Sequence, residues 1–184
     1  MWRPSGWAIC RDTQHEMADP PVTSTHHGDD DGGDARHGNW LDATQLMSVL
    51  AHRYPLLLVD RIRVIESGRK ALGIKRVTGS EWLGVVSTLP DPEMPGLLVV
   101  EALAQTSAGV LLGLLDGSQG VIGYFAAANR VRFRTLPRAG DTLSLAVDLQ
   151  WFRKGVARLA GIATVEGRLA VTAQFTAVVR GRAA

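Results

Sequence analysis

The chain of 184 residues has few of the residue types that build cross-links and metal centres. Its one cysteine, Cys10, excludes a disulfide framework and leaves no second thiol for a zinc site, so we expect no bound metal. All five histidines lie at or before His52, so no imidazole is available in the rest of the chain. No basic stretch followed by an apolar run begins the sequence, and we therefore expect a cytoplasmic protein.

Charge divides the chain into two unequal parts. Residues 1–40 hold three basic and seven acidic side chains, which leaves 17 basic and 11 acidic side chains for the rest. The first part has no apolar periodicity, and its histidines have no metal-ligand spacing. We predict a flexible, low-complexity tail over residues 1–40 and one folded domain over residues 41–184.

Local patterns in the second part predict an α+β domain. Asp42 is a candidate N-cap for a helix that ends near Leu50, and strands are predicted over Leu56–Ile65 and Ala71–Val77. A long helix is predicted within Met94–Leu115. Four β-type segments follow it, at 121–135, 142–153, 156–165 and 169–180. One curved antiparallel sheet wrapped around a long central helix satisfies this order.

The long apolar segment approaches the length of a membrane span. However, Glu101 and Gln105 lie toward its middle, and no charged flanks or aromatic belt surround it. We therefore predict a helix enclosed by protein, with no membrane partner.

Two long motifs are familiar. Residues 52–61 read His-Arg-Tyr-Pro-Leu-Leu-Leu-Val-Asp-Arg, and residues 94–105 read Met-Pro-Gly-Leu-Leu-Val-Val-Glu-Ala-Leu-Ala-Gln. With Tyr124-Phe-Ala126, Arg132-Phe-Arg134 and Gly140-Asp141, they resemble the bacterial 3-hydroxyacyl-acyl-carrier-protein dehydratases of fatty-acid synthesis. The resemblance covers residues 43–180 and implies the hot-dog fold. It also implies loss of water from a thioester on the phosphopantetheine arm of acyl carrier protein, with no other cofactor.

The resemblance places three groups of the site on the central helix. Glu101 matches the carboxyl that helps the hydroxyl leave, and Gly96 matches the backbone N–H that polarises the thioester carbonyl. Gln105 lies one turn after Glu101 on the same face and is expected to orient it. Arg132 and Phe133 are candidate substrate-binding residues.

The family's catalytic histidine is missing. Ser87 occupies its position, and a serine hydroxyl cannot take a proton at neutral pH without a base of its own. His52 matches a different family histidine, and we expect it to be structural. Asp91 and Glu93 are alternative bases, but a solvated acid in a loop is a weak base.

Several functions follow from this pattern. The resemblance implies dimers whose sites combine a histidine of one subunit with a carboxyl of the other, so this chain is expected to share a site with a histidine-bearing paralogue. The alternatives are a non-catalytic acyl-thioester binding or scaffold subunit of fatty-acid or polyketide synthesis, a divergent stand-alone dehydratase, or a thioesterase. A homodimer, a heterodimer and a hexamer remain open.

The expected partner in every case is an acidic acyl carrier protein. Basic residues that suit such a partner lie in the later strands and turns: Arg132, Arg134, Arg138, Arg153 and Lys154. No aromatic-interleaved basic motif supports binding of nucleic acid.

Overall fold

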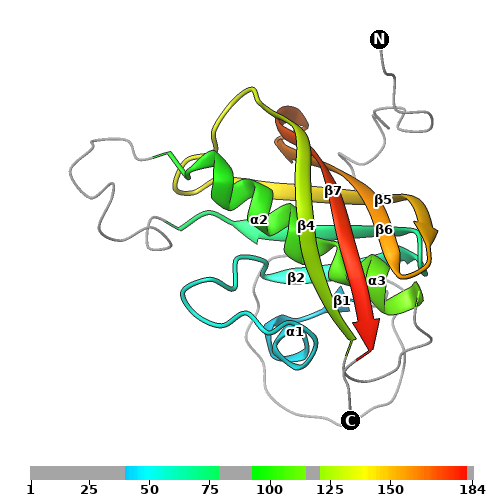
Figure 1. The fold of residues 1–184 in the computed structure, drawn as a ribbon. Coiled ribbons are helices and arrows are strands. Elements are labelled where there is room, and N and C mark those ends of the chain that lie inside the picture. Colours follow the sequence, from blue (N-terminus) through cyan, green and yellow to red (C-terminus); the bar gives the residue numbers. More distant parts are fainter. Residues whose placement is uncertain (1–39, 79–92, 115–120, 182–184) are drawn as a thin grey trace, which may run out of the picture. The chain divides into compact units, whose positions relative to one another are not determined.

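The computed structural model describes residues 40–78, 93–114 and 121–181. In this part of the chain, seven strands and three helices follow one another (Figure 1). Their bounds are β1 (Trp40–Leu41), α1 (Ala43–Val49), β2 (Arg61–Glu66), β3 (Lys70–Arg76), α2 (Gly96–Thr106), α3 (Ala108–Leu114), β4 (Val121–Phe133), β5 (Thr142–Arg153), β6 (Val156–Val165) and β7 (Arg168–Gly181). The predicted tail over residues 1–40 lies outside the described residues, except for Trp40.

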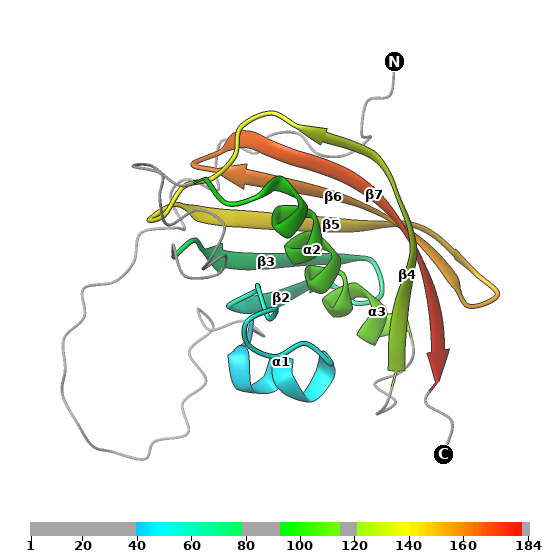
Figure 2. The ribbon, with the colours of Figure 1, turned by 60° about the vertical axis from the view of Figure 1, so that its left-hand side comes forward.

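The strands form one antiparallel sheet in the order β1-β2-β3-β5-β6-β7-β4. Helices α2 and α3 lie on the concave side of this sheet (Figure 2). Strand β4 pairs with β7 along one side, and no described residue pairs with its other side. The predicted α+β architecture, a curved antiparallel sheet around a central helix, is confirmed.

Small residues on the inner face let the helix approach the sheet closely. A Cβ atom on Gly161 of β6 would lie 3.2 Å from the Leu103 side chain of α2, and one on Gly73 of β3 would meet Thr106. Large apolar side chains from the neighbouring strands then fill the core around the helix, among them Leu145, Leu159 and Phe175.

The central helix is interrupted, in contrast to the single helix that the sequence predicts. Helix α2 ends at Thr106 and α3 begins at Ala108, with Ser107 between them. The Thr106 hydroxyl donates to the Ala102 carbonyl at 2.8 Å, and the Ser107 hydroxyl donates to that of Ala104 at 2.6 Å. Such bonds compete for backbone carbonyls and bend helices.

The segment Gly96–Leu114 is long and apolar enough to cross a membrane, with a mean hydropathy of 1.8. In the structure, 56% of its most apolar stretch is buried, and its side chains pack against the sheet. This arrangement is typical of the core helix of a globular domain.

The strand predicted over Leu56–Ile65 is wrong in its first half, because β2 begins only at Arg61. Leu58 and Val59 are buried, but they belong to a loop that contributes to the core without joining the sheet. The Leu58 N–H donates to the side chain of Gln105. This side chain takes the place of the backbone carbonyl that a neighbouring strand would supply.

Both predicted tight hairpins are present. The central residues of the two turns, Lys154-Gly155 and Glu166-Gly167, all have positive φ, between 48° and 75°. This is the pattern of type I′ turns, whose twist matches that of the strands they join.

Asp42 caps α1 as predicted, because its side chain accepts the Gln45 N–H at 2.9 Å while the Gln45 side chain accepts the Asp42 N–H.

Candidate active site on helix α2

Glu101 lies midway along α2 with its side chain 32% exposed. Its immediate sequence neighbours are apolar, and Ala102 and Leu103 are fully buried in the core. A carboxylate in such surroundings needs partners. The structure supplies two of them, both on the same oxygen, Oε1.

Gln105 is the first partner and is itself only 2% exposed. Its Nε2 donates to Glu101 Oε1 at 2.9 Å and to the Leu56 carbonyl at 2.7 Å. Its own Oε1 accepts the Leu58 N–H at 2.9 Å. Gln105 thus joins the helix to the loop before β2 and contacts the carboxylate that the spacing places beside it.

His52 is the second partner, and the sequence assigned it only a structural role. Its Nε2 lies 3.2 Å from Glu101 Oε1, and its side chain is 33% exposed. The other ring nitrogen, Nδ1, is buried and has no hydrogen-bond partner among the described residues. No sequence spacing relates His52 to Glu101; the one available signal was that both belong to the recognised motifs.

Gly96 is the first residue of α2, with Pro95 as its N-cap. Leu98 and Val99 donate to the Pro95 carbonyl, and no described residue accepts the Gly96 N–H. Five residues separate Gly96 from Glu101, which is about 7.5 Å along a helix axis. A backbone donor at a helix N-terminus and a carboxyl therefore lie within the span of a small substrate group.

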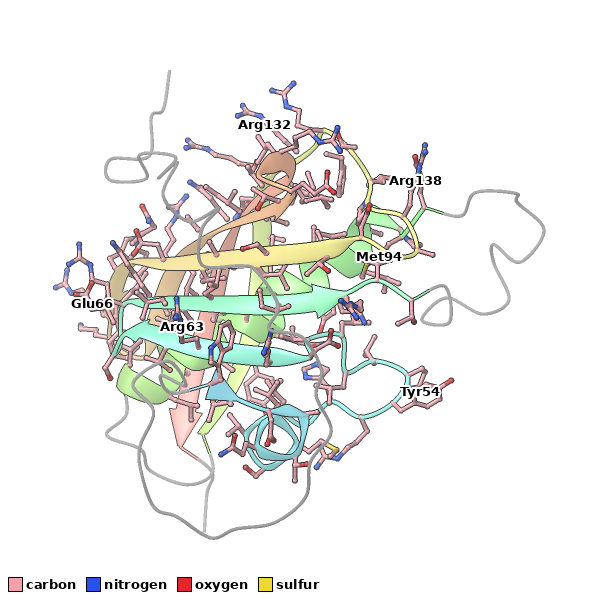
Figure 3. All side chains as sticks on the ribbon, turned by 180° about the vertical axis from the view of Figure 1, so that it is seen from behind. Tyr54, Arg63, Glu66, Met94, Arg132 and Arg138 are labelled. Carbon is pink, nitrogen blue, oxygen red and sulfur yellow. The ribbon has the colours of Figure 1, made fainter. Side chains whose placement is uncertain are left out.

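Phe133 and Arg132 do not lie together. A Cβ atom on Gly96 would stand 2.5 Å from the Phe133 ring, so this ring covers the start of α2. Arg132 is the preceding residue on β4, and successive side chains of a strand point to opposite faces. Arg132 therefore points away from the helix, as its exposed position in Figure 3 shows.

The basic residues do not form the single cluster that the sequence suggests. Phe133 pairs with Val171 on β7, whereas the Gly155 carbonyl accepts the N–H of Val179. Eight residues of strand separate these points, or roughly 27 Å. Arg132, Arg134 and Arg138 lie at the end where α2 begins, since the Arg134 N–H donates to the Ala170 carbonyl and Arg138 bridges Glu93. Arg153 and Lys154 lie at the opposite end, where β5 turns into β6.

Glu93 is tied to an arginine. Its Oε1 lies 3.2 Å from Arg138 Nη2, and the two residues form an isolated antiparallel bridge. An exposed carboxylate held by a guanidinium is poorly suited to take a proton from carbon. Ser87 and Asp91, the other positions considered for the missing base, lie outside the described residues.

Comparison with known proteins shows the family of this chain. A family model described as a FabA-like domain matches residues 50–174. The 3-hydroxyacyl-[acyl-carrier-protein] dehydratase FabZ of Ligilactobacillus salivarius is 42% identical over 136 residues, covering 74% of this chain and 96% of that protein. The chain belongs to the FabA-like dehydratase family.

Solved structures share the fold of this family member at low identity. The dehydratase heterocomplex ApeI:P from Xenorhabdus doucetiae superposes with a TM-score of 0.60 at 15% identity, covering 74% of this chain and 91% of that one. A hypothetical thioesterase with coenzyme A from Streptococcus pneumoniae gives 0.51 at 15% identity, covering 67% and 88%. The predicted hot-dog fold is confirmed.

Among the described residues, no group of three His, Cys, Asp or Glu could hold a metal ion.

Proposed function

We propose that this chain is a subunit of a dehydratase that acts on 3-hydroxyacyl thioesters of acyl carrier protein, and that it supplies Glu101 to a site shared with a histidine-bearing paralogue. The observation that carries this is the half-buried Glu101, held through one oxygen and placed one and a half turns after the free N–H of Gly96. The pathway is fatty-acid or polyketide synthesis in the cytoplasm.

In the proposed reaction, the partner's imidazole takes the proton from the α-carbon of the thioester. The electron pair of that C–H bond becomes the new double bond, and the C–O bond to the 3-hydroxyl breaks. The carboxyl of Glu101 gives its proton to the departing hydroxyl, which leaves as water. The Gly96 N–H stabilises the negative charge that develops on the thioester oxygen. Beyond the phosphopantetheine arm of the substrate, these steps use no cofactor.

The position of His52 supports a base that comes from a second chain. His52 faces Glu101 with Nε2, and its Nδ1 is buried, so neither nitrogen is open to a substrate. No histidine follows His52 in the sequence. These observations support a base supplied by another polypeptide.

Strand β4 is the proposed contact with that second chain. No described residue pairs with its outer side, and Tyr124, Phe125 and Phe133 on it are 57%, 41% and 48% exposed. An open strand edge carrying aromatic side chains favours pairing with another strand. The heterocomplex of dehydratases with the same fold is a precedent for an unlike pair.

Complementation tests the shared site directly. The second chain is a FabZ-type dehydratase that carries the family's catalytic histidine and whose own catalytic carboxylate has been changed to Gln, so that it is inactive alone. Co-purified with this chain, it should dehydrate a 3-hydroxybutyryl carrier protein, as followed by enoyl thioester absorbance. With Glu101→Gln, we expect the rate to fall about 10²–10⁴-fold.

Glu93→Gln is the matched control, because this exposed acid contacts Arg138 and not the site. It should leave the restored rate unchanged. If the wild-type chain restores no activity, or if Glu101→Gln restores as much as wild type, the shared site is refuted and an acyl-thioester binding subunit becomes the better account.

A further inference from the structure

The carboxylate of Glu101 is held asymmetrically. Gln105 Nε2 donates to Oε1 at 2.9 Å, and His52 Nε2 lies 3.2 Å from the same oxygen. No described residue donates to the second oxygen, Oε2, although the side chain is one-third exposed. One oxygen is therefore bound by the protein and the other is open.

Two contacts on one oxygen restrict the carboxylate more than one contact does. A single hydrogen bond leaves the group free to turn about its last bond, because terminal carboxyl torsions are broad. A second nitrogen against the same oxygen limits this rotation and keeps the two oxygens from exchanging places. Both nitrogens belong to residues near the same loop, since His52 precedes it and Gln105 binds Leu56 and Leu58 within it.

The surroundings of His52 indicate which of its nitrogens carries the proton. Nε2 faces a carboxylate, which accepts hydrogen bonds. Nδ1 is buried without a partner among the described residues. A ring with its proton on Nε2 satisfies the carboxylate and leaves no buried N–H donor unpaired at Nδ1. In this form Nε2 is the nitrogen that can donate to Oε1 of Glu101.

We propose that His52 is a positioning residue that, together with Gln105, binds Oε1 of Glu101 and reserves Oε2 for the 3-hydroxyl of the substrate. This role rests on the proposed function, because it assigns His52 a part in the same proton transfer. It differs from the role of the partner's histidine, which takes a proton from carbon. His52 acts through Glu101 and does not touch the substrate.

The complementation assay separates this role from a general-base role. His52→Leu fills a similar volume without a donor, and we expect kcat to fall about 10²-fold with KM unchanged, the cost of a misplaced catalytic group. His52→Gln can present a side-chain N–H at a similar reach, and it should restore most of the lost rate. If His52→Gln is as slow as His52→Leu, or if both match wild type, the positioning role is overturned.

A spectroscopic measurement on the full chain, without substrate or partner, tests the contact itself. Long-range ¹H–¹⁵N correlation spectra distinguish the two imidazole tautomers, and the His52 ring is identified by its loss in His52→Gln. We expect the Nε2–H tautomer in the wild type and a mixture in Glu101→Leu. A ring protonated on Nδ1, or one unaffected by Glu101→Leu, refutes the inference. If the spectra are as expected but no mixture with the second chain shows restored activity, the proposed function is refuted and the contact between His52 and Glu101 stands.

Discussion

The ring of Phe133 occupies the space that a side chain on Gly96 would need. An ideal Cβ atom on Gly96 falls 2.5 Å from two carbons of that ring. An aromatic residue of β4 therefore covers the first turn of α2, at the amide that we assign to the thioester oxygen. Glycine at this position is explained by the close approach of the ring.

Gly96→Ala tests this contact. The added methyl group must displace Phe133 or the helix start, and overpacking of this kind costs about 1–3 kcal/mol. Thermal or urea unfolding should show this loss, and the restored dehydratase rate should fall as the amide moves. Leu97→Ala is the control, because this neighbouring side chain is 74% exposed. Equal stability of the two variants would contradict the contact.

Gln105→Leu should destabilise the domain through the backbone it leaves unpaired. The buried Leu58 N–H and the Leu56 carbonyl would both lose their partner, at a cost of about 1–3 kcal/mol for an unsatisfied buried group. Gln174→Leu is the comparison, since this buried glutamine bonds a side chain, that of Arg158. We expect a smaller loss of unfolding free energy there, and a loss of equal size would argue against the backbone role.

The separation of the basic residues predicts which of them affects the carrier protein. Arg134 is exposed at the end where α2 begins, where its N–H donates to the Ala170 carbonyl. Arg153 is exposed at the far end of the sheet, where β5 turns into β6. Arg134→Glu should raise KM for a carrier-protein substrate, with little change for the same acyl group on free pantetheine. Arg153→Glu should change neither value. A similar rise from both variants would mean that total charge, and not its position, governs docking.

The open side of β4 predicts the effect of a charge placed there. Ala128 is exposed opposite Phe175 of β7, and a lysine at an edge strand disfavours pairing with a further strand. Ala128→Lys should lower the mass of the complex with the second chain toward that of a single chain, as measured by light scattering. Thr142→Lys, at an exposed end of the interior strand β5, should not. An unchanged mass for Ala128→Lys would place the contact elsewhere.

Local chemistry made much of the fold predictable. The pairs Lys154-Gly155 and Glu166-Gly167 specify their turns through their own backbone preferences, and Asp42 caps its helix within three residues. The apolar run at Leu56–Val59 was misleading, since Leu58 within it donates to the side chain of Gln105 and not to a neighbouring strand. A hydrogen bond of this kind joins residues that are far apart in the chain, and the periodicity of a short segment contains no information about it.

The site was predictable only in its helical half. Glu101 and Gln105 are one turn apart, so helix geometry alone brings them together. The approach of His52 depends on how the loop before β2 packs on α2, and the division of the arginines depends on strand direction and register. Both are tertiary relationships. For the arginines, the sequence suggested one cluster, whereas the structure divides them between two ends of the sheet.

The three hydrogen bonds of Gln105 have a mechanical consequence. They join the loop at Leu56 and Leu58 to the carboxylate of Glu101 through a single rigid amide. Tyr54, in the same loop, is 81% exposed and points away from the domain (Figure 3). A partner that presses on this loop would therefore displace the acid without touching it, so that docking at the surface and readiness of the proton donor form one coupled event.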